Sequence, residues 1–419
     1  MNKINLREVV NFSLKAEGNN KVTLLGVGPM SKTLIKASLL LAKRKDFPIM
    51  FIASRNQVDS KELGGGYVCN WDQKGFHEAI KEVAKDIDFD GLYYLCRDHG
   101  GPWQRDNERK AHLLEDEAMK LGKQSYLEDL INGFDLLHID PTKDPYVVGK
   151  VIDLDVVLNR TIELIEYIEN ERKARGINEI GYEVGTEETN GGLTSTETYE
   201  NFIKKLTEEL TKKNLPLPVF IVGQTGTLTR LTENVGNYSI DNAKRLADVA
   251  KKYTVGLKEH NGDYLNEQIL LVHPASGVTA TNVAPEYGTV ETQSYLKLIE
   301  VEEDLFNQGL ISDKSNLKTV LRTKAAESER WRKWMVGDKI NISVVEVLKD
   351  EKLMDLITEI SGHYTFNNDE VKKEITTLYN NLNSVGIDGE KFVITKIQES
   401  LDRYVQCFNL EGLTSKLMN

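Results

Sequence analysis

Residues 95–103 place an acid and an imidazole side by side, as Asp98 and His99. The pair follows an apolar run, residues 89–95, and precedes the glycines and proline of residues 100–102. That pattern is typical of the carboxyl end of a parallel strand that opens into a loop. The pair could supply a proton-transfer group and a metal ligand from one strand end. It could equally serve as a cap or a surface hydrogen bond, so by itself it leaves both interpretations open.

The elements that must position this pair follow a regular alternation. Amphipathic segments, with charged and apolar residues spaced by three and four, separate eight short apolar runs, as helices separate strands. The runs are residues 22–27, 48–53, 91–96, 134–139, 179–184, 216–222, 254–258 and 268–272. Eight alternations predict an α/β fold, a (β/α)₈ TIM barrel. An open doubly wound sheet is the alternative, but only the first two glycines of a Gly-x-Gly-x-x-Gly fingerprint are present, Gly26 and Gly28.

Two regions are expected in the 419 residues. Residues 1–310 form the barrel domain, with residues 285–308 as its eighth helix, and residues 311–419 form an α-helical C-terminal extension. Helical patterns in the extension cover residues 317–335, 343–360, 369–382 and 392–407. We expect the extension to pack on the barrel or on a partner subunit.

The composition excludes several classes of function. The chain is 40% hydrophobic and 28% charged, as globular proteins are, and its net charge of −12 argues against nucleic-acid binding. Its three cysteines are too widely spaced for a disulfide framework or a zinc knuckle. It has neither a signal-peptide pattern nor the roughly 18 consecutive apolar residues of a membrane span. We therefore expect a cytoplasmic protein that binds neither membrane nor nucleic acid.

Unusual polar residues follow the predicted strands, and active sites in this fold lie at the carboxyl ends of the strands. His99 and His260 have acidic neighbours that could orient an imidazole, and glycines that open the loop. His138 lies inside an apolar run and is interpreted as a packing residue, whereas His273 is either a ligand or a hydrogen-bonded rim residue. Other polar residues at these ends include Asn56, Gln57, Arg97, Asp140, Glu183, Glu187, Lys258 and Asp263. Surface positions are expected for His77, His112 and His363.

Histidines and carboxylates without a cysteine cluster suit zinc or a similar divalent metal ion. Such an ion would act as a Lewis acid on a carbonyl or an enediolate, and a carboxylate beside it could move protons. Two small-residue loops, at Ser276 with Gly277 and at residues 223–226, could bind a phosphate or carboxylate through backbone N–H groups.

Several motifs in this order share a pattern with one family. They are residues 53–58 with 65–67, residues 98–102, residues 137–140, residues 185–187 with 191–192, residues 260–264, and the aromatic–basic residues 331–334 and 361–364. The chain resembles the non-catalytic subunit of class II tagatose-bisphosphate aldolase, a family that includes tagaturonate epimerases. It departs from the family at residues 96–97, 141–142 and 271–274. Because these positions border the substrate, we expect a different and, from Arg97 and His273, more anionic substrate.

The resemblance implies a metal-dependent carbohydrate enzyme. It would act on a ketose, a ketose phosphate or a uronate by retro-aldol and aldol chemistry, as a C4 epimerase or a tagatose-bisphosphate-type aldolase. His99, His260 and Glu187 would hold the divalent ion, and Asp98, with Glu187, would be catalytic, Asp98 carrying the hydroxyl proton. The sugar or sugar phosphate would be bound by Asn56, Gln57, Arg97, Asp140, Lys258, Asp263 and His273.

Two alternatives remain. The chain could be a non-catalytic subunit that stabilises a separate aldolase partner, or that forms a homo-oligomer, but a scaffold gains nothing from keeping acids and imidazoles together. It could also be a sugar isomerase that moves a proton between C1 and C2.

Overall fold

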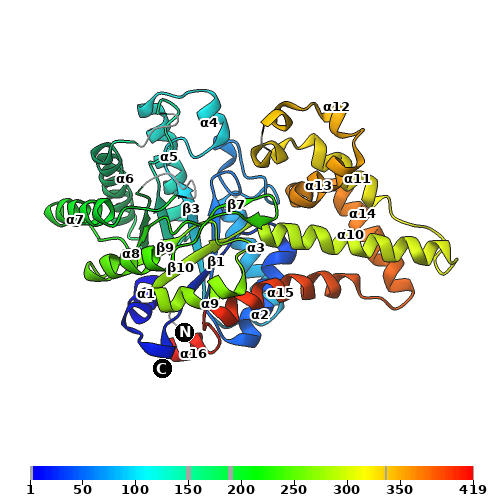
Figure 1. Cartoon of the computed structure of the whole chain (residues 1–419), viewed down its shortest axis with the longest axis horizontal. Coiled ribbons are helices and arrows are strands. Elements are labelled where there is room, and N and C mark those ends of the chain that lie inside the picture. Colours follow the sequence, from blue (N-terminus) through cyan, green and yellow to red (C-terminus); the bar gives the residue numbers. More distant parts are fainter. Residues whose placement is uncertain (1–2, 148–151, 187–191, 336, 419) are drawn as a thin grey trace.

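The computed structural model describes residues 3–147, 152–186, 192–335 and 337–418. Eight parallel strands close into a barrel, in which β1 pairs with both β2 and β10 (Figure 1). The strands are β1 (Leu24–Val27), β2 (Ile49–Ser54), β3 (Tyr93–Gly100), β4 (Leu136–Ile139), β5 (Gly181–Val184), β6 (Phe220–Val222), β9 (Gly256–Glu259) and β10 (Val278–Val283). The predicted (β/α)₈ barrel is therefore confirmed. A short antiparallel hairpin, β7 (Thr229–Arg230) with β8 (Glu233–Asn234), follows β6.

Helices cover the outside of the barrel, and this explains why the strands are almost entirely buried. They are α2 (Lys32–Lys45), α3 (Gln73–Asp86), α5 (Glu115–Ile131), α6 (Leu154–Ala174), α7 (Thr196–Lys212), α8 (Ile240–Lys252), α9 (Glu267–Ser276) and α10 (Pro285–Asn307). Helix α1 (Leu6–Lys15) precedes the first strand, and α4 (Asp106–Lys110) lies in the loop after β3. Among the helices described here, none is both long enough and apolar enough to cross a membrane.

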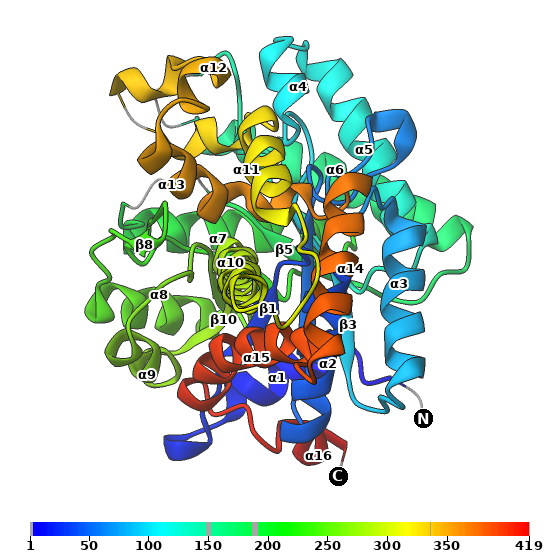
Figure 2. The ribbon, with the colours of Figure 1, turned by 90° about the vertical axis from the view of Figure 1, so that its right-hand side faces the viewer.

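The C-terminal region is helical, as predicted. It contains α11 (Leu317–Glu327), α12 (Val344–Val347), α13 (Glu351–Ser361), α14 (Asp369–Ser384), α15 (Gly389–Cys407) and α16 (Leu413–Met418). Helix α15 packs against α2, α9 and α10, so the region rests on the barrel. Helices α11 to α13 lie at the same end of the molecule as α4, whereas α1 and α16 lie at the opposite end (Figure 2). The C-terminal region therefore reaches the carboxyl ends of the strands; the boundary at residue 310 stays a prediction.

The eighth strand lies later in the chain than predicted. Residues 268–272 belong to helix α9, and the strand is β10. Asn266 accepts a hydrogen bond from the Ile269 backbone N–H at 2.9 Å, which caps the start of α9, and Gly277 ends the helix with a φ of 83°. The prediction was wrong because periodicity cannot distinguish a short apolar run in a strand from one in a buried helix.

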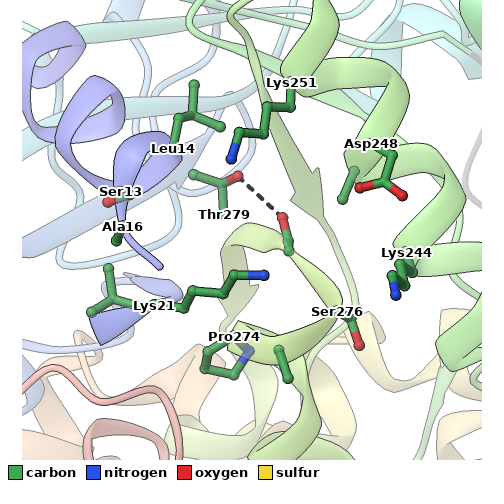
Figure 3. Close-up of a pocket in the computed structure, with 14 residues that line it drawn as sticks. Ser13, Leu14, Ala16, Lys21, Lys244, Asp248, Lys251, Pro274, Ser276 and Thr279 are labelled. Atoms are coloured by element: carbon green, nitrogen blue, oxygen red, sulfur yellow. Dashed lines mark hydrogen bonds between the residues drawn. The ribbon is translucent and has the colours of Figure 1, made fainter. Parts of the chain in front are cut away.

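A pocket of about 90 Å³ lies at the amino end of β10 and is lined by Lys21, Lys251, Ser276 and Thr279 (Figure 3). The predicted anion loop at Ser276 and Gly277 falls here, away from the carboxyl ends of the strands. The Gly277 N–H already donates to the Pro274 carbonyl, and the end of a helix dipole disfavours an anion. In the second predicted loop, the N–H of Gly223 donates to the Lys258 carbonyl. The first loop therefore does not support the predicted anion site, and in the second the N–H groups of Gly223 and Gln224 are occupied.

Candidate metal centre at the mouth of the barrel

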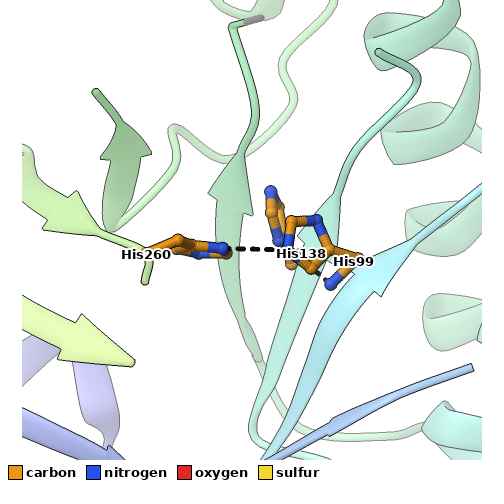
Figure 4. A group of neighbouring side chains, drawn as sticks. All are labelled: His99, His138 and His260. Atoms are coloured by element: carbon orange, nitrogen blue, oxygen red, sulfur yellow. Dashed lines mark hydrogen bonds between the residues drawn. The ribbon is translucent and has the colours of Figure 1, made fainter. Parts of the chain in front are cut away.

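Three imidazoles meet at the carboxyl ends of the strands (Figure 4). His99 lies in β3, His138 in β4, and His260 directly follows β9. One ring nitrogen from each lies within 4.8 Å of the other two, a spacing that could hold a metal ion. The structure thus brings His99 and His260 together, as predicted. It adds His138, which was predicted to be a packing residue because it lies inside an apolar run.

A backbone irregularity lets the neighbours Asp98 and His99 both reach this cluster. Successive side chains of a strand ordinarily point to opposite faces. Here the register between β3 and β4 shifts between Arg97 and Gly100, and His99 adopts a φ of 45°, in the left-handed region. Bulges and strained residues of this kind gather next to functional sites.

Two of the imidazoles are supported by a carboxylate on their outer nitrogen. His99 Nδ1 lies 2.6 Å from Asp140 Oδ2, and His260 Nε2 lies 2.8 Å from Glu183 Oε1. This leaves His99 Nε2 and His260 Nδ1 facing each other at 3.0 Å. A carboxylate behind a histidine fixes its tautomer and orientation for metal binding. Asp140 was predicted to bind substrate, but its carboxylate is instead hydrogen-bonded to His99.

His138 contributes a neutral imidazole. Its Nδ1 accepts the His99 backbone N–H at 3.1 Å, and its Nε2 has no hydrogen-bond partner among the described residues. Burial lowers the pKa of His138 to about 4, despite the opposing charges of Glu183 and Asp140. Burial alone would also lower the pKa of His99, but Asp98 and Asp140 raise it above its usual value. Metal ligation requires the neutral form of histidine, which His138 retains at neutral pH.

Asp98 lies beside the cluster as a candidate base. Its Oδ1 is 3.9 Å from His99 Nε2 and 3.8 Å from His260 Nδ1. Burial alone would raise the pKa of Asp98, but the neighbouring His99 and His260 lower it. Asn282, in β10, donates from Nδ2 to Asp98 Oδ1 at 3.0 Å, while its own Oδ1 has no partner among the described residues.

Sequence reasoning missed Asn282 because it misplaced the eighth strand. The signal that could have found it is the run of residues 278–283, where valine and threonine, both favoured in strands, alternate with smaller or polar residues.

Glu183 and Lys258 form a buried ion pair beneath the histidines. Lys258 Nζ donates to Glu183 Oε2, and the two side chains are 1% and 0% exposed. Burial alone would raise the pKa of Glu183, but Lys258 and His138 hold it well below its usual range. Lys258 was predicted to bind substrate, but its ammonium group is paired with Glu183 instead. This ion pair holds Glu183 in position for its contact with His260.

Arg97 does not face the mouth. Its guanidinium is fully buried outside the barrel, donating from Nε to Asp129 of α5 at 2.8 Å and from Nη1 to the Ala53 and Val58 carbonyls. The predicted role at the anionic end of the substrate does not fit this position. The reason is the alternation of the strand, which sends Arg97 outward and Asp98 inward.

His273 and Asp263 are also occupied by structural contacts. His273, in α9, is fully buried with Nε2 2.8 Å from Glu259 Oε1, away from the cluster. Asp263 Oδ1 accepts the backbone N–H groups of Ala284 and Glu286, both at 2.9 Å, at the start of α10. His273 does not fit the predicted substrate contact, because its Nδ1 also lies 2.8 Å from the Ile269 carbonyl and both ring nitrogens are occupied. The predicted substrate role of Asp263 stays a prediction.

Asn56 and Gln57 remain at the rim that follows β2. Asn56 Nδ2 donates to the Gln104 carbonyl at 3.2 Å, and Gln57 Oε1 accepts the Ser54 N–H at 2.8 Å. Glu187 lies outside the described residues, so its predicted role as a metal ligand and catalytic residue stays a prediction.

A family model described as D-tagatose-1,6-bisphosphate aldolase subunit GatZ/KbaZ-like matches residues 9–406, almost the whole chain. The chain belongs to this family. Comparison with curated protein sequences gives no match. The family-model match confirms the family resemblance that the sequence motifs indicated.

Solved structures show the same fold. A probable tagatose 6 phosphate kinase from Sinorhizobium meliloti 1021 superposes with a TM-score of 0.75 at 18% identity, covering 92% of this chain and 100% of that one. A fructose-bisphosphate aldolase from Campylobacter jejuni gives a TM-score of 0.55 at 11% identity, with 97% and 94% covered. At these identities the likeness of the GatZ/KbaZ-like protein to both structures concerns the fold alone.

Proposed function

We propose that this GatZ/KbaZ-like protein is a metal-dependent carbohydrate enzyme. It acts on a ketose, a ketose phosphate or a uronate by retro-aldol and aldol chemistry, as a C4 epimerase or an aldolase. The observation that carries the proposal is the convergence of His99, His138 and His260 on one point, with Asp98 beside two of them.

The donor set fits a divalent ion, which we propose to be zinc. Three imidazoles, two of them backed by carboxylates, are a preferred set for zinc at a catalytic site, where a further position stays open for substrate. The place of His138 in the cluster supports this, because one of its ring nitrogens lies within 4.8 Å of those of His99 and His260. We therefore propose His138 as the third ligand. When bound, the ion would supply Lewis-acid stabilisation of negative charge that develops on the substrate.

Asp98 supplies the proton transfer in this proposal. It takes the proton of the C4 hydroxyl while the C3–C4 bond breaks, so that C4 becomes a carbonyl and the electron pair moves onto C3 and the C2 carbonyl. It returns the proton when the bond forms again. Addition to the opposite face of the aldehyde gives the C4 epimer. Release of the aldehyde, with the proton passing from Asp98 to C3 of the enediolate, gives aldolase activity. Asn282 holds Asp98 in place by donating from Nδ2 to its Oδ1.

The test combines metal analysis with a substrate screen. The protein is loaded with Zn²⁺, and ketoses, uronates and their phosphates are screened by NMR for epimerised or cleaved products. Asp98→Asn should keep the metal and lose at least about 100-fold in kcat, as expected for a general base. Asp304→Asn, on the exposed side of α10, is the control. Absence of bound metal after repletion, or full activity of Asp98→Asn, would refute the proposal.

The family description favours a second candidate, because it names an aldolase subunit. In this case the chain would stabilise a separate catalytic aldolase and would itself turn nothing over. Size-exclusion chromatography with an aldolase subunit, combined with the product screen on this chain alone, separates the two. A stable complex without turnover by this chain supports the subunit role.

A further inference from the structure

The C-terminal region brings a cluster of cations and aromatic rings to the mouth of the barrel. Arg330 and Lys333 lie in the 3₁₀ turn Arg330–Trp334, and Tyr364 lies in the turn Gly362–Thr365. The Arg330 guanidinium lies 4.1 Å from the ring centre of Tyr67 and 5.5 Å from that of Tyr364, while Lys333 Nζ lies 5.1 Å from that of Tyr364. We call Arg330, Lys333, Tyr67 and Tyr364 the arginine–lysine cluster.

Tyr67 ties this cluster to the rim next to Asp98. Its backbone N–H donates to the Asn56 carbonyl at 3.0 Å, within the loop that follows β2. In the same loop, Gln57 follows Asn56, and its side-chain Oε1 accepts a hydrogen bond from the Ser54 backbone N–H at 2.8 Å. Ser54 is the register partner of Asp98 in the neighbouring strand. The arginine–lysine cluster therefore stands over the rim on the same side of the mouth as Asp98.

The side-chain N–H groups of Arg330 and Lys333 remain available to a ligand. Among the described side chains, neither Arg330 nor Lys333 has a carboxylate or hydrogen-bond partner, whereas nearby Arg332 pairs with Glu329 at 2.8 Å. A cation held against the face of an aromatic ring is fixed in position without using its N–H groups. Arg330 and Lys333 thus have donors left for a ligand, and an arginine fork matches a phosphate or carboxylate.

A buried histidine, His363, lies next to the cluster. His363 is 2% exposed, and both of its ring nitrogens lack a hydrogen-bond partner among the described residues. Its ring centre lies 4.1 Å from that of Tyr364. Burial, together with the charges of Lys333 and Arg330, lowers the pKa of His363 to about 3. The two cations without a carboxylate partner among the described residues lie close together and suit an anion.

We propose that the arginine–lysine cluster binds the phosphate group of a sugar phosphate whose reacting carbons lie at the three histidines. This deepens the proposed function and rests on it for the other end of the sugar. The positive charge that was expected from Arg97 would then come from the C-terminal region. A barrel loop and the C-terminal region would together form one subsite.

Binding is measured by calorimetry, so the test does not depend on turnover. Inorganic phosphate, fructose 6-phosphate and fructose are titrated into the Zn²⁺-loaded wild type, Arg330→Gln, Lys333→Gln and the control Lys352→Gln. Lys352 is an exposed lysine of α13, outside the cluster. Each cluster variant should weaken both phosphate ligands about 10-fold, the scale of one charge-assisted hydrogen bond, and leave fructose unchanged. Lys333 is exposed, so its variant keeps the test valid even if Arg330→Gln folds poorly.

The outcomes separate this proposal from the proposed function. Weakened binding of both inorganic phosphate and fructose 6-phosphate in Lys333→Gln supports the subsite even if no sugar is turned over. Unchanged binding of fructose 6-phosphate in both variants overturns it, even if the enzyme is active. If only inorganic phosphate is affected, the cluster is a site for free phosphate, and its assignment to the sugar is overturned.

Discussion

Asp140 Oδ2 accepts a hydrogen bond from Nδ1–H of His99 at 2.6 Å, between the ends of two neighbouring strands. Asp140 is 3% exposed and also accepts the Thr142 N–H at 3.2 Å, so its carboxylate is fixed from two sides. The hydrogen bond leaves Nε2 of His99 as the free ring nitrogen, the one that faces His260. Asp140 is thus a positioning residue for the candidate metal ligand.

Asp140→Asn should weaken Zn²⁺ binding about 10–100-fold, the usual cost of losing a carboxylate behind a ligating histidine. The affinity is measured by competition with a chromophoric chelator. Asp304→Asn serves as the matched control on an exposed helix face. An unchanged affinity would show that Asp140 does not orient a ligand.

His138→Ala should lower the metal affinity and His273→Ala only the stability, because only His138 lies in the cluster. We expect His138→Ala to lower the Zn²⁺ affinity by more than about 100-fold, beyond the cost of an outer partner. His273→Ala should keep the metal and lose about 1–3 kcal/mol of unfolding free energy, since Glu259 loses a buried partner. Metal titration and urea unfolding of both variants provide the measurements. Equal metal loss in the two variants would contradict the assignment.

Arg97→Met should act on stability rather than on substrate affinity. It leaves the fully buried Asp129 without its ion-pair partner, and breaking such a pair costs about 3–5 kcal/mol. The double variant Arg97→Met with Asp129→Leu should recover part of that loss, because no unpaired charge remains. Urea unfolding checks both. A raised KM for an anionic substrate at unchanged stability would restore Arg97 as a substrate residue.

Glu291, in α10, makes stability depend on pH. Ser31 Oγ donates to its carboxyl group at 2.6 Å, and burial raises its pKa from 4.5 to about 7. The folded state therefore binds this proton more tightly than the unfolded state. The stabilisation is fully present below about pH 4.5 and is lost as the pH rises through 7.

In Glu291→Gln this dependence should vanish, because the amide stays neutral. The unfolding free energy of the wild type minus that of the variant should fall by at most about 3 kcal/mol between pH 5 and 8. Other titrating groups are common to both proteins and cancel in this difference. Urea unfolding across that range gives the values. A difference that stays flat would show that Glu291 is ionised throughout.

Much of the candidate site could be read from local patterns. Asp98 and His99 followed an apolar run, and His260 had acidic neighbours and a glycine, so their place at strand ends followed from the eightfold alternation. His138 was harder, because a histidine within an apolar run can face either the barrel interior or the helices. Glu183 stood out only as a polar residue at a strand end, and its contact with His260 spans 77 positions in the sequence.

The sequence by itself determined the barrel, the strand ends that carry the histidines, and the family, because periodicity and short motifs are local properties of the chain. The tertiary structure decided which side chains share the mouth. Arg97 turned outward, and His273 fell in a helix and not at a strand end. A bulge let Asp98 and His99 face the same way, and the C-terminal turn placed Arg330 beside Tyr67. These outcomes depend on strand register, on one misplaced strand and on contacts between distant segments, which no local pattern encodes.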